Sequence, residues 1–92
     1  MSASVVKVLK ISNRRGLHAR ASAKFVQCVS EFDAEIRVSK DGHVVGGDSI
    51  MGLMMLAASD GSTIHVSAIG PDAEQAINAL SSLIESKFGE TE

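Results

Sequence analysis

Two stretches of the chain, residues 34–40 and 62–70, alternate between apolar and polar residues over most of their length. The apolar residues that recur at every second position, and are expected to face inward, are Ala34, Ile36, Val38, Ile64, Val66 and Ala68. Because successive side chains of a strand point to opposite faces, each stretch predicts a strand that is buried on one face only. A sheet of such strands is covered by helices on one face and meets water on the other. The pattern therefore predicts a two-layer α+β domain.

Two further strands and three helices are expected around this pair. Residues 5–11 are rich in β-branched side chains and predict the first strand, and residues 43–45 predict a short return strand after a Lys-Asp-Gly turn. Helices are expected over residues 18–30 and within residues 46–61, the latter with Asp48 or Ser49 as its cap and Gly61 past its end. The order is thus β-α-β-β-α, followed by the strand at 62–70 and a last helix.

The last helix is expected over residues 70–89, with Pro71 in its first turn and Gly89 at its end. It carries one apolar stripe, formed by Ala73, Ala76, Ile77, Leu80, Leu83 and Ile84. We therefore expect a single domain over residues 1–92, with one four-stranded antiparallel sheet covered on one face by three helices.

Composition excludes several classes of protein. Three phenylalanines are the only aromatic residues, too few for a base-stacking platform, so we expect no nucleic-acid partner. The single cysteine, Cys28, excludes an internal disulfide, and no Cys/His cluster has the spacing of a zinc site. The longest apolar run is far short of the ~20 residues that cross a bilayer, and residues 1–10 lack the apolar core of a signal peptide. We expect a cytoplasmic protein with no bound metal or cofactor and no membrane insertion.

Charge is distributed unevenly along the chain. Six cations and no acid lie in the first 24 residues, whereas all eleven acids lie at or after Glu31. Such asymmetry is typical of a basic face that meets an anion or an acidic partner, although solvated charges can also become unbalanced by chance.

His18 lies at the expected start of the first helix, two residues after Gly16, which suits a tight turn. The first N–H groups of a helix lack intrahelical partners and favour an anion, and their field disfavours a protonated imidazole. A phosphoryl group on His18 would be held by these amides and by Arg20. A polar surface histidine is the alternative, and a metal ligand is a weaker one. His43 and His65 are expected to be solvent-facing sheet residues that do not converge with His18.

The stretch GLHARASAKFVQ, followed about thirty residues later by GDSIMGLMML, closely resembles the HPr family, the histidine-containing phosphocarriers of the bacterial phosphotransferase system. The likeness covers essentially the whole chain and implies the family's open-faced sandwich fold. It implies that His18 accepts a phosphoryl group from phosphorylated enzyme I and donates it to a histidine of an EIIA-type protein. In the family the bond is to Nδ1, and Arg20 matches the phosphate-stabilising arginine. The carrier is a stoichiometric intermediate and not a stand-alone enzyme.

The resemblance also implies a surface on which partners dock. Basic residues of the first helix form its charged half and residues of the second helix its apolar half. We define this docking face as Ala19, Arg20, Ala23, Lys24, Gln27, Ile50, Met51 and Met54. Methionines suit a surface that repacks against several partners, whereas Leu53 and Leu56 are expected in the core. Core packing is the alternative for the methionines, and it applies more strongly to Met55.

Ser49 is first of all a candidate N-cap. The resemblance adds phosphorylation of this serine by HPr kinase/phosphorylase, in hosts that carry that enzyme, which would place negative charge within the docking face. Asp48 stands where a lysine is often found. Ala21 replaces a proline usual in the family, and we expect a tolerated change in phosphohistidine lability.

We therefore expect a phosphocarrier that acts as a monomer, in the sugar-uptake or the nitrogen-related branch of the system. The rival function is a non-catalytic regulatory module that binds a protein or a small ligand on the same scaffold.

Overall fold

The structure is a computed structural model that describes residues 4–90. Its elements follow the predicted order and end with a short 3₁₀ turn. They are β1 (Ser4–Lys10), α1 (Ala19–Val29), β2 (Glu35–Lys40), β3 (His43–Gly46), α2 (Ile50–Met55), β4 (Thr63–Ile69), α3 (Ala73–Glu85) and the 3₁₀ turn η1 (Lys87–Gly89).

The four strands form one antiparallel sheet in the order β1-β4-β2-β3. β4 lies between β1 and β2, so that Val66 faces Lys7 on one side and Val38 on the other. The alternation predicted from the sequence is confirmed, since the inward residues of the two central strands are buried. These residues are Ile36, Val38, Ile64, Val66 and Ala68.

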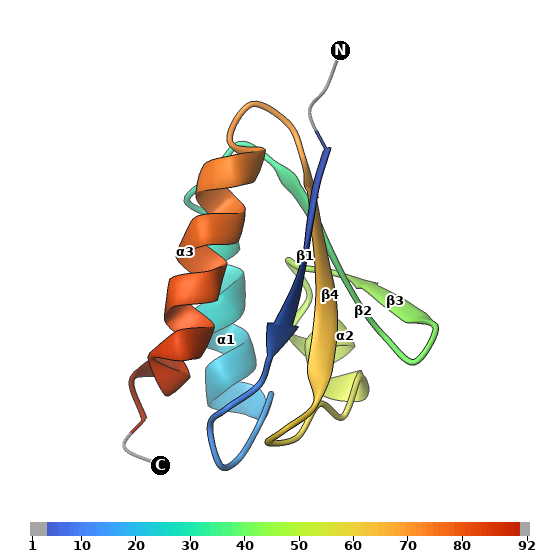
Figure 1. Ribbon diagram of the computed structural model, residues 1–92, viewed down its shortest axis with the longest axis vertical. Coiled ribbons are helices and arrows are strands. Elements are labelled where there is room, and N and C mark those ends of the chain that lie inside the picture. Colours follow the sequence, from blue (N-terminus) through green and yellow to red (C-terminus); the bar gives the residue numbers. More distant parts are fainter. Residues whose placement is uncertain (1–3, 91–92) are drawn as a thin grey trace.

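The helices α1 and α3 lie side by side on one face of this sheet, as Figure 1 shows. The core between the two layers holds Phe25 of α1 and Leu80 of α3, both fully buried. α2 packs against α1 and β3 and adds Leu53 to the same core. The opposite face of the sheet is open, with Val6 and Val44 more than half exposed. The predicted two-layer architecture is thereby confirmed.

Both boundaries of the last helix differ from the prediction. α3 begins at Ala73, with Asp72 at the N-cap position, so Pro71 precedes the helix and does not lie in its first turn. α3 also ends at Glu85, because Lys87 and Phe88 adopt positive φ angles of 58° and 55° that no α-helix accommodates. Gly89, expected as the helix end, closes the following 3₁₀ turn instead.

α2 is shorter than the sequence suggested. It ends at Met55, because Ala57 adopts a φ of 52° and turns the chain out of the helix. Gly61, expected just past the end of this helix, lies in the later turn that leads into β4. Within residues 4–90, no helix is both long enough and apolar enough to span a bilayer.

The antiparallel course of α1 and α3 decides where the functional region lies. α1 begins at the end of the domain where α3 finishes (Figure 1). Residues near position 18 and residues near position 90 are therefore neighbours in space, although almost the whole chain separates them.

Candidate functional site

The loop before α1 is fixed by a glycine turn. Gly16 has a φ of +64°, and its N–H donates to the carbonyl of Asn13 at 3.1 Å. A Cβ at Gly16 would come within 2.2 Å of the Ala58 carbonyl oxygen, so the loop needs glycine both for its backbone angle and for its close approach to the segment after α2. The turn expected at Gly16 is confirmed.

His18 is the N-cap residue of α1. Its backbone is extended, with φ −73° and ψ −179°, and its side-chain Nδ1 accepts a hydrogen bond from the backbone N–H of Arg20 at 3.3 Å. The first i to i−4 bond of the helix runs from Ser22 N to His18 O at 2.9 Å. The amides of Ala19, Arg20 and Ala21 therefore lie ahead of the regular bonding pattern, at the positive end of the helix. Nδ1 faces this end.

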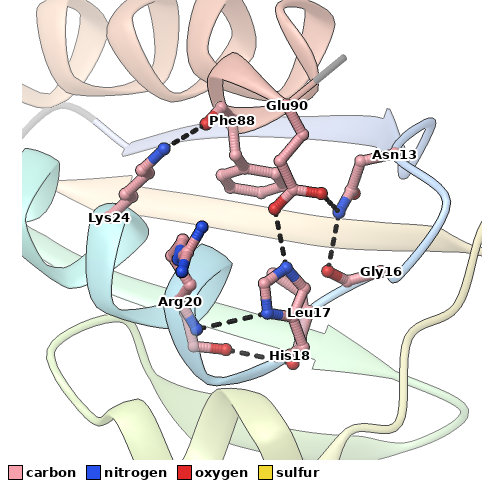
Figure 2. A network of polar contacts seen from close by, with 9 residues as sticks. Asn13, Gly16, Leu17, His18, Arg20, Lys24, Phe88 and Glu90 are labelled. Atoms are coloured by element: carbon pink, nitrogen blue, oxygen red, sulfur yellow. Dashed lines mark hydrogen bonds and ion pairs between the residues drawn. The ribbon is translucent and has the colours of Figure 1, made fainter. Parts of the chain in front are cut away.

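The other ring nitrogen of His18 is engaged by an acid from the far end of the chain. Nε2 lies 2.6 Å from Oε2 of Glu90, and Oε1 of the same carboxylate accepts from Asn13 Nδ2 at 3.1 Å (Figure 2). The side chains of His18 and Glu90 are 24% and 18% exposed, so the ring remains accessible at one edge. A carboxylate accepts only, which makes Nε2 the protonated nitrogen and leaves the Nδ1 lone pair facing the helix.

The environment of Glu90 favours its charged form. Partial burial opposes ionisation, but hydrogen bonds from His18 and Asn13, together with the charges of His18 and Lys24, hold the pKa of Glu90 below its usual range. Sequence reasoning missed this residue, because no local pattern links position 90 to position 18.

A shallow hollow of about 410 Å³ opens beside the His18 ring. Four cationic side chains and one acid line it, together with the ring and Gly89: Arg14, Arg15, Arg20, Lys24 and Glu90. In Figure 2 the Arg20 side chain lies beside the ring, on the helix that His18 caps. The hollow thus gathers most of the basic residues of the first third of the chain, and it suits a small anion such as a phosphoryl group. Among residues 4–90, no group of three or more His, Cys, Asp or Glu side chains could hold a metal ion.

The residues assigned to the docking face lie on α1 and α2, which pack against each other, and two of them, Arg20 and Lys24, line the hollow itself. On α1, Ala19, Ala23 and Gln27 are exposed and lie at i, i+4 and i+8, which places them on one side of the helix. α2 packs against α1 and exposes Ile50, Met51 and Met54 by 40%, 73% and 44%.

The methionines divide differently from the prediction. Leu53 and Leu56 are buried, as expected, whereas Met55 is 79% exposed and is the most exposed of the three described methionines of α2. Core packing, the alternative that applied more strongly to Met55 than to Met51 and Met54, is therefore wrong for Met55. The reason is geometric: α2 has only six residues, and Leu53 alone fills its inward position.

Ser49 caps α2, and of the two candidates it rather than Asp48 performs this role. Its Oγ accepts from the backbone N–H of Gly52 at 2.9 Å, and the next residue in the chain, Ile50, is exposed. Ala21, at the position where the family usually has proline, is fully buried in the first turn of α1. His43 and His65 are exposed on the sheet and lie outside the hollow, as predicted.

Comparison with known proteins agrees with this geometry. The family model described as the PTS HPr component phosphorylation site matches residues 5–86. The chain belongs to the HPr family of phosphocarrier proteins. It is 49% identical over 82 residues to phosphocarrier protein HPr of Cupriavidus necator, covering 89% of this chain and 92% of that protein. The crystal structure of HPr-C-His from Thermoanaerobacter tengcongensis superposes with a TM-score of 0.91 at 49% identity, covering 96% and 99% of the two chains.

The HPr family also includes carriers with a different name. Phosphocarrier protein NPr of Shewanella violacea is 41% identical over 80 residues, which is 87% of this chain and 88% of that protein. The resemblance drawn from the sequence is therefore confirmed for the family and for the fold. Membership of the HPr family makes this chain a phosphocarrier of the phosphotransferase system.

Proposed function

We propose that Nδ1 of His18 accepts a phosphoryl group from phosphorylated enzyme I and passes it to a histidine of an EIIA-type protein. The observation that carries this proposal is that the two ring nitrogens of His18 have different surroundings. Glu90 occupies Nε2, whereas Nδ1 faces the start of α1 and accepts only from the backbone N–H of Arg20. Nδ1 is therefore the nitrogen whose lone pair can attack phosphorus.

The transfer is a simple exchange of bonds. The Nδ1 lone pair of His18 forms a new N–P bond while the P–N bond to the donor's histidine breaks, and its electron pair stays with the donor's ring. The hydrogen bond from Arg20 N to Nδ1 is exchanged for bonds to phosphoryl oxygens. Arg20 stabilises the charge of the group, and its planar guanidinium suits two phosphoryl oxygens at once. No cofactor takes part in the step carried by this chain.

The docking face would serve enzyme I and the EIIA-type acceptors in turn, since a carrier must present the same histidine to both. A partner with an apolar groove rimmed by acids matches its two halves, the exposed Ile50, Met51 and Met54 on α2 and the cations Arg20 and Lys24 on α1. We expect the carrier to act as a cytoplasmic monomer. Its relatives named HPr and NPr leave both the sugar-uptake and the nitrogen-related branch as settings for the relay.

Ser49 is the proposed regulatory phosphosite. Its hydroxyl lies at the start of α2, beside the apolar half of the docking face. A phosphate there is compatible with the helix end, so regulation would act by repelling an acidic partner and not by unfolding α2. HPr kinase/phosphorylase is the expected enzyme in hosts that carry it.

Incubation with enzyme I and phosphoenolpyruvate tests the relay. The wild-type protein should gain one phosphoryl group that is labile in acid and stable in alkali, and His18→Ala should gain none. His65→Ala is the matched control, because this exposed sheet histidine lies outside the hollow, and it should be labelled like the wild type. Equal labelling of the wild type and His18→Ala would refute the assignment and favour the rival function, a non-catalytic binding module.

A second incubation tests Ser49. With HPr kinase and ATP, an acid-stable phosphoryl group should appear on the wild type and be absent from Ser49→Ala. Labelling of Ser49→Ala to the wild-type level would place the phosphosite elsewhere.

A further inference from the structure

The carboxylate of Glu90 has two donors aimed at it, one at each oxygen. His18 Nε2 lies 2.6 Å from Oε2, and Asn13 Nδ2 lies 3.1 Å from Oε1. Asn13 is fully buried and is itself held by a second bond from the same Nδ2 to the Gly16 carbonyl at 2.9 Å. The acid is thus tied to the histidine and to the loop that positions the histidine.

A specific chain reversal brings Glu90 to this place. After α3, Lys87, Phe88 and Gly89 take φ angles of 58°, 55° and 76°, and the Glu90 N–H donates to the Lys87 carbonyl at 2.9 Å. The Phe88 ring is buried in the core, with 1% exposed, and Lys24 Nζ donates to the Phe88 carbonyl at 2.5 Å (Figure 2). Backbone strain at two non-glycine residues persists only where the surroundings enforce it, and here a buried ring and a lysine do so.

We propose that Glu90 is a positioning residue for phosphoryl transfer, which keeps the proton of His18 on Nε2 and steadies the cationic ring that forms when Nδ1 is phosphorylated. This inference rests on the proposed role of His18. In the neutral ring one nitrogen carries a proton and the other a lone pair, and a partner at one nitrogen decides which. The contact with Glu90 therefore keeps the Nδ1 lone pair available for attack.

The same contact becomes stronger as the reaction proceeds. When Nδ1 of a ring already protonated at Nε2 bonds to phosphorus, no proton leaves and the ring itself becomes positive. The Nε2–H bond to Glu90 then changes from a neutral donor on a carboxylate to a cation on a carboxylate, which is the stronger kind. An interaction that strengthens with developing charge accelerates the step.

The arrangement requires a carboxylate and not merely an acceptor. In Glu90→Gln one of the two side-chain oxygens becomes an NH2 group, so either His18 Nε2–H or Asn13 Nδ2–H faces another donor. Glu90→Gln keeps the length and shape of the side chain but loses both the charge and one of the two hydrogen bonds.

The experiment compares wild type, Glu90→Gln and a charge-matched control, Glu31→Gln, whose exposed side chain lies outside the hollow. Each is phosphorylated with enzyme I and phosphoenolpyruvate, and loss of the phosphoryl group is followed against pH. The other charged groups that line the hollow with His18 are Arg14 and Arg15 from the loop and Arg20 and Lys24 from α1, and all are unchanged in these variants.

The protonated phosphohistidine ring is the better leaving group, so loss of the phosphoryl group speeds up as the ring becomes protonated. The Glu90 carboxylate favours this protonated ring, and losing it should therefore move the midpoint of the profile to lower pH by about half a unit or more. In Glu90→Gln we also expect kcat for phosphorylation to fall about three- to ten-fold while KM for enzyme I stays within about two-fold, because the docking face is intact. The control Glu31→Gln should match the wild type in both measurements.

Superposition of the Glu90→Gln and wild-type pH profiles would overturn the positioning role. A direct measurement keeps the proposal testable even if this variant folds poorly: ¹H–¹⁵N correlation spectra of the wild-type ring should place the proton on Nε2, and a proton on Nδ1 would refute the proposal. Failure of the wild type to be phosphorylated at all, or labelling that survives in His18→Ala, would instead refute the relay itself. The two failures are therefore distinguishable.

Discussion

The backbone of Gly16 lies directly against the backbone of Ala58. Leu17 N, the next amide, donates to the Ala58 carbonyl at 2.9 Å, and a Cβ on Gly16 would come within 2.2 Å of that same oxygen. This contact joins the loop that carries His18 to the segment that follows α2. The histidine and the methionine-bearing helix therefore keep a fixed mutual position, which a shared docking face requires.

Replacement of Gly16 should be costly for this reason. Gly16→Ala places a methyl group against backbone that cannot rotate away, at a φ of +64°, and we expect a loss of about 3 kcal/mol in the free energy of unfolding. Gly42→Ala is the control, because Gly42 has a φ of +83° with nothing within 4 Å, and it should lose only about 1 kcal/mol. Denaturant titration measures both. Equal losses in the two variants would show that the contact with Ala58 contributes nothing to the free energy of unfolding.

Substitutions at Ser49 should separate its capping role from the effect of charge. Asn and Asp both cap helices about as well as Ser, so Ser49→Asn and Ser49→Asp should keep the free energy of unfolding of the wild type. Ser49→Ala should lose about 1 kcal/mol of it. Only Ser49→Asp adds charge beside the docking face, and kcat/KM for phosphorylation by enzyme I should fall about five-fold at low salt. The fall should shrink as salt is added. An equal fall in Ser49→Asn would mean that the shape of residue 49 matters and its charge does not.

Two residues of α2 should respond in opposite ways to truncation. Met51 is 73% exposed, so Met51→Ala should change the free energy of unfolding by no more than about 0.5 kcal/mol but raise KM for enzyme I about five-fold. Leu53 is fully buried, and Leu53→Ala should cost about 2–5 kcal/mol. Thermal denaturation and steady-state phosphorylation assays test the pair. An unchanged KM in Met51→Ala would remove this methionine from the docking face.

The wild type should be more stable than Glu90→Gln by an amount that depends on pH. Because the pKa of Glu90 is held below its usual range, the contact stabilises the fold at neutral pH and is lost as the pH falls below about 4, through the lowered folded-state value. Both side chains keep some contact with water, so the difference between wild type and Glu90→Gln should be no more than about 1 kcal/mol at neutral pH and should approach zero near pH 2. Denaturant titrations at a series of pH values measure it. A difference that is constant with pH would mean that the charge of Glu90 contributes nothing to the stability.

Local sequence patterns were sufficient to predict the architecture and the position of His18. The period of two in residues 34–40 and 62–70 reports which face of a strand is buried, and the spacing of apolar residues does the same for α1 and α3. His18 could be placed at a helix start because capping depends on a few neighbouring residues. Helix ends were harder to predict from the sequence. α3 ends at Glu85 because Phe88 packs in the core, and this is a tertiary effect.

Residues within a few positions of one another are enough to predict the order of the elements, the one-sided sheet and the position of His18 at the beginning of a helix. The acid that meets the imidazole, and the ring nitrogen that stays open, depend instead on how the elements pack together. Glu90 reaches Nε2 because α1 and α3 run antiparallel and a left-handed reversal returns the chain to the start of α1. Contacts between residues 72 positions apart depend on packing, which no local pattern contains.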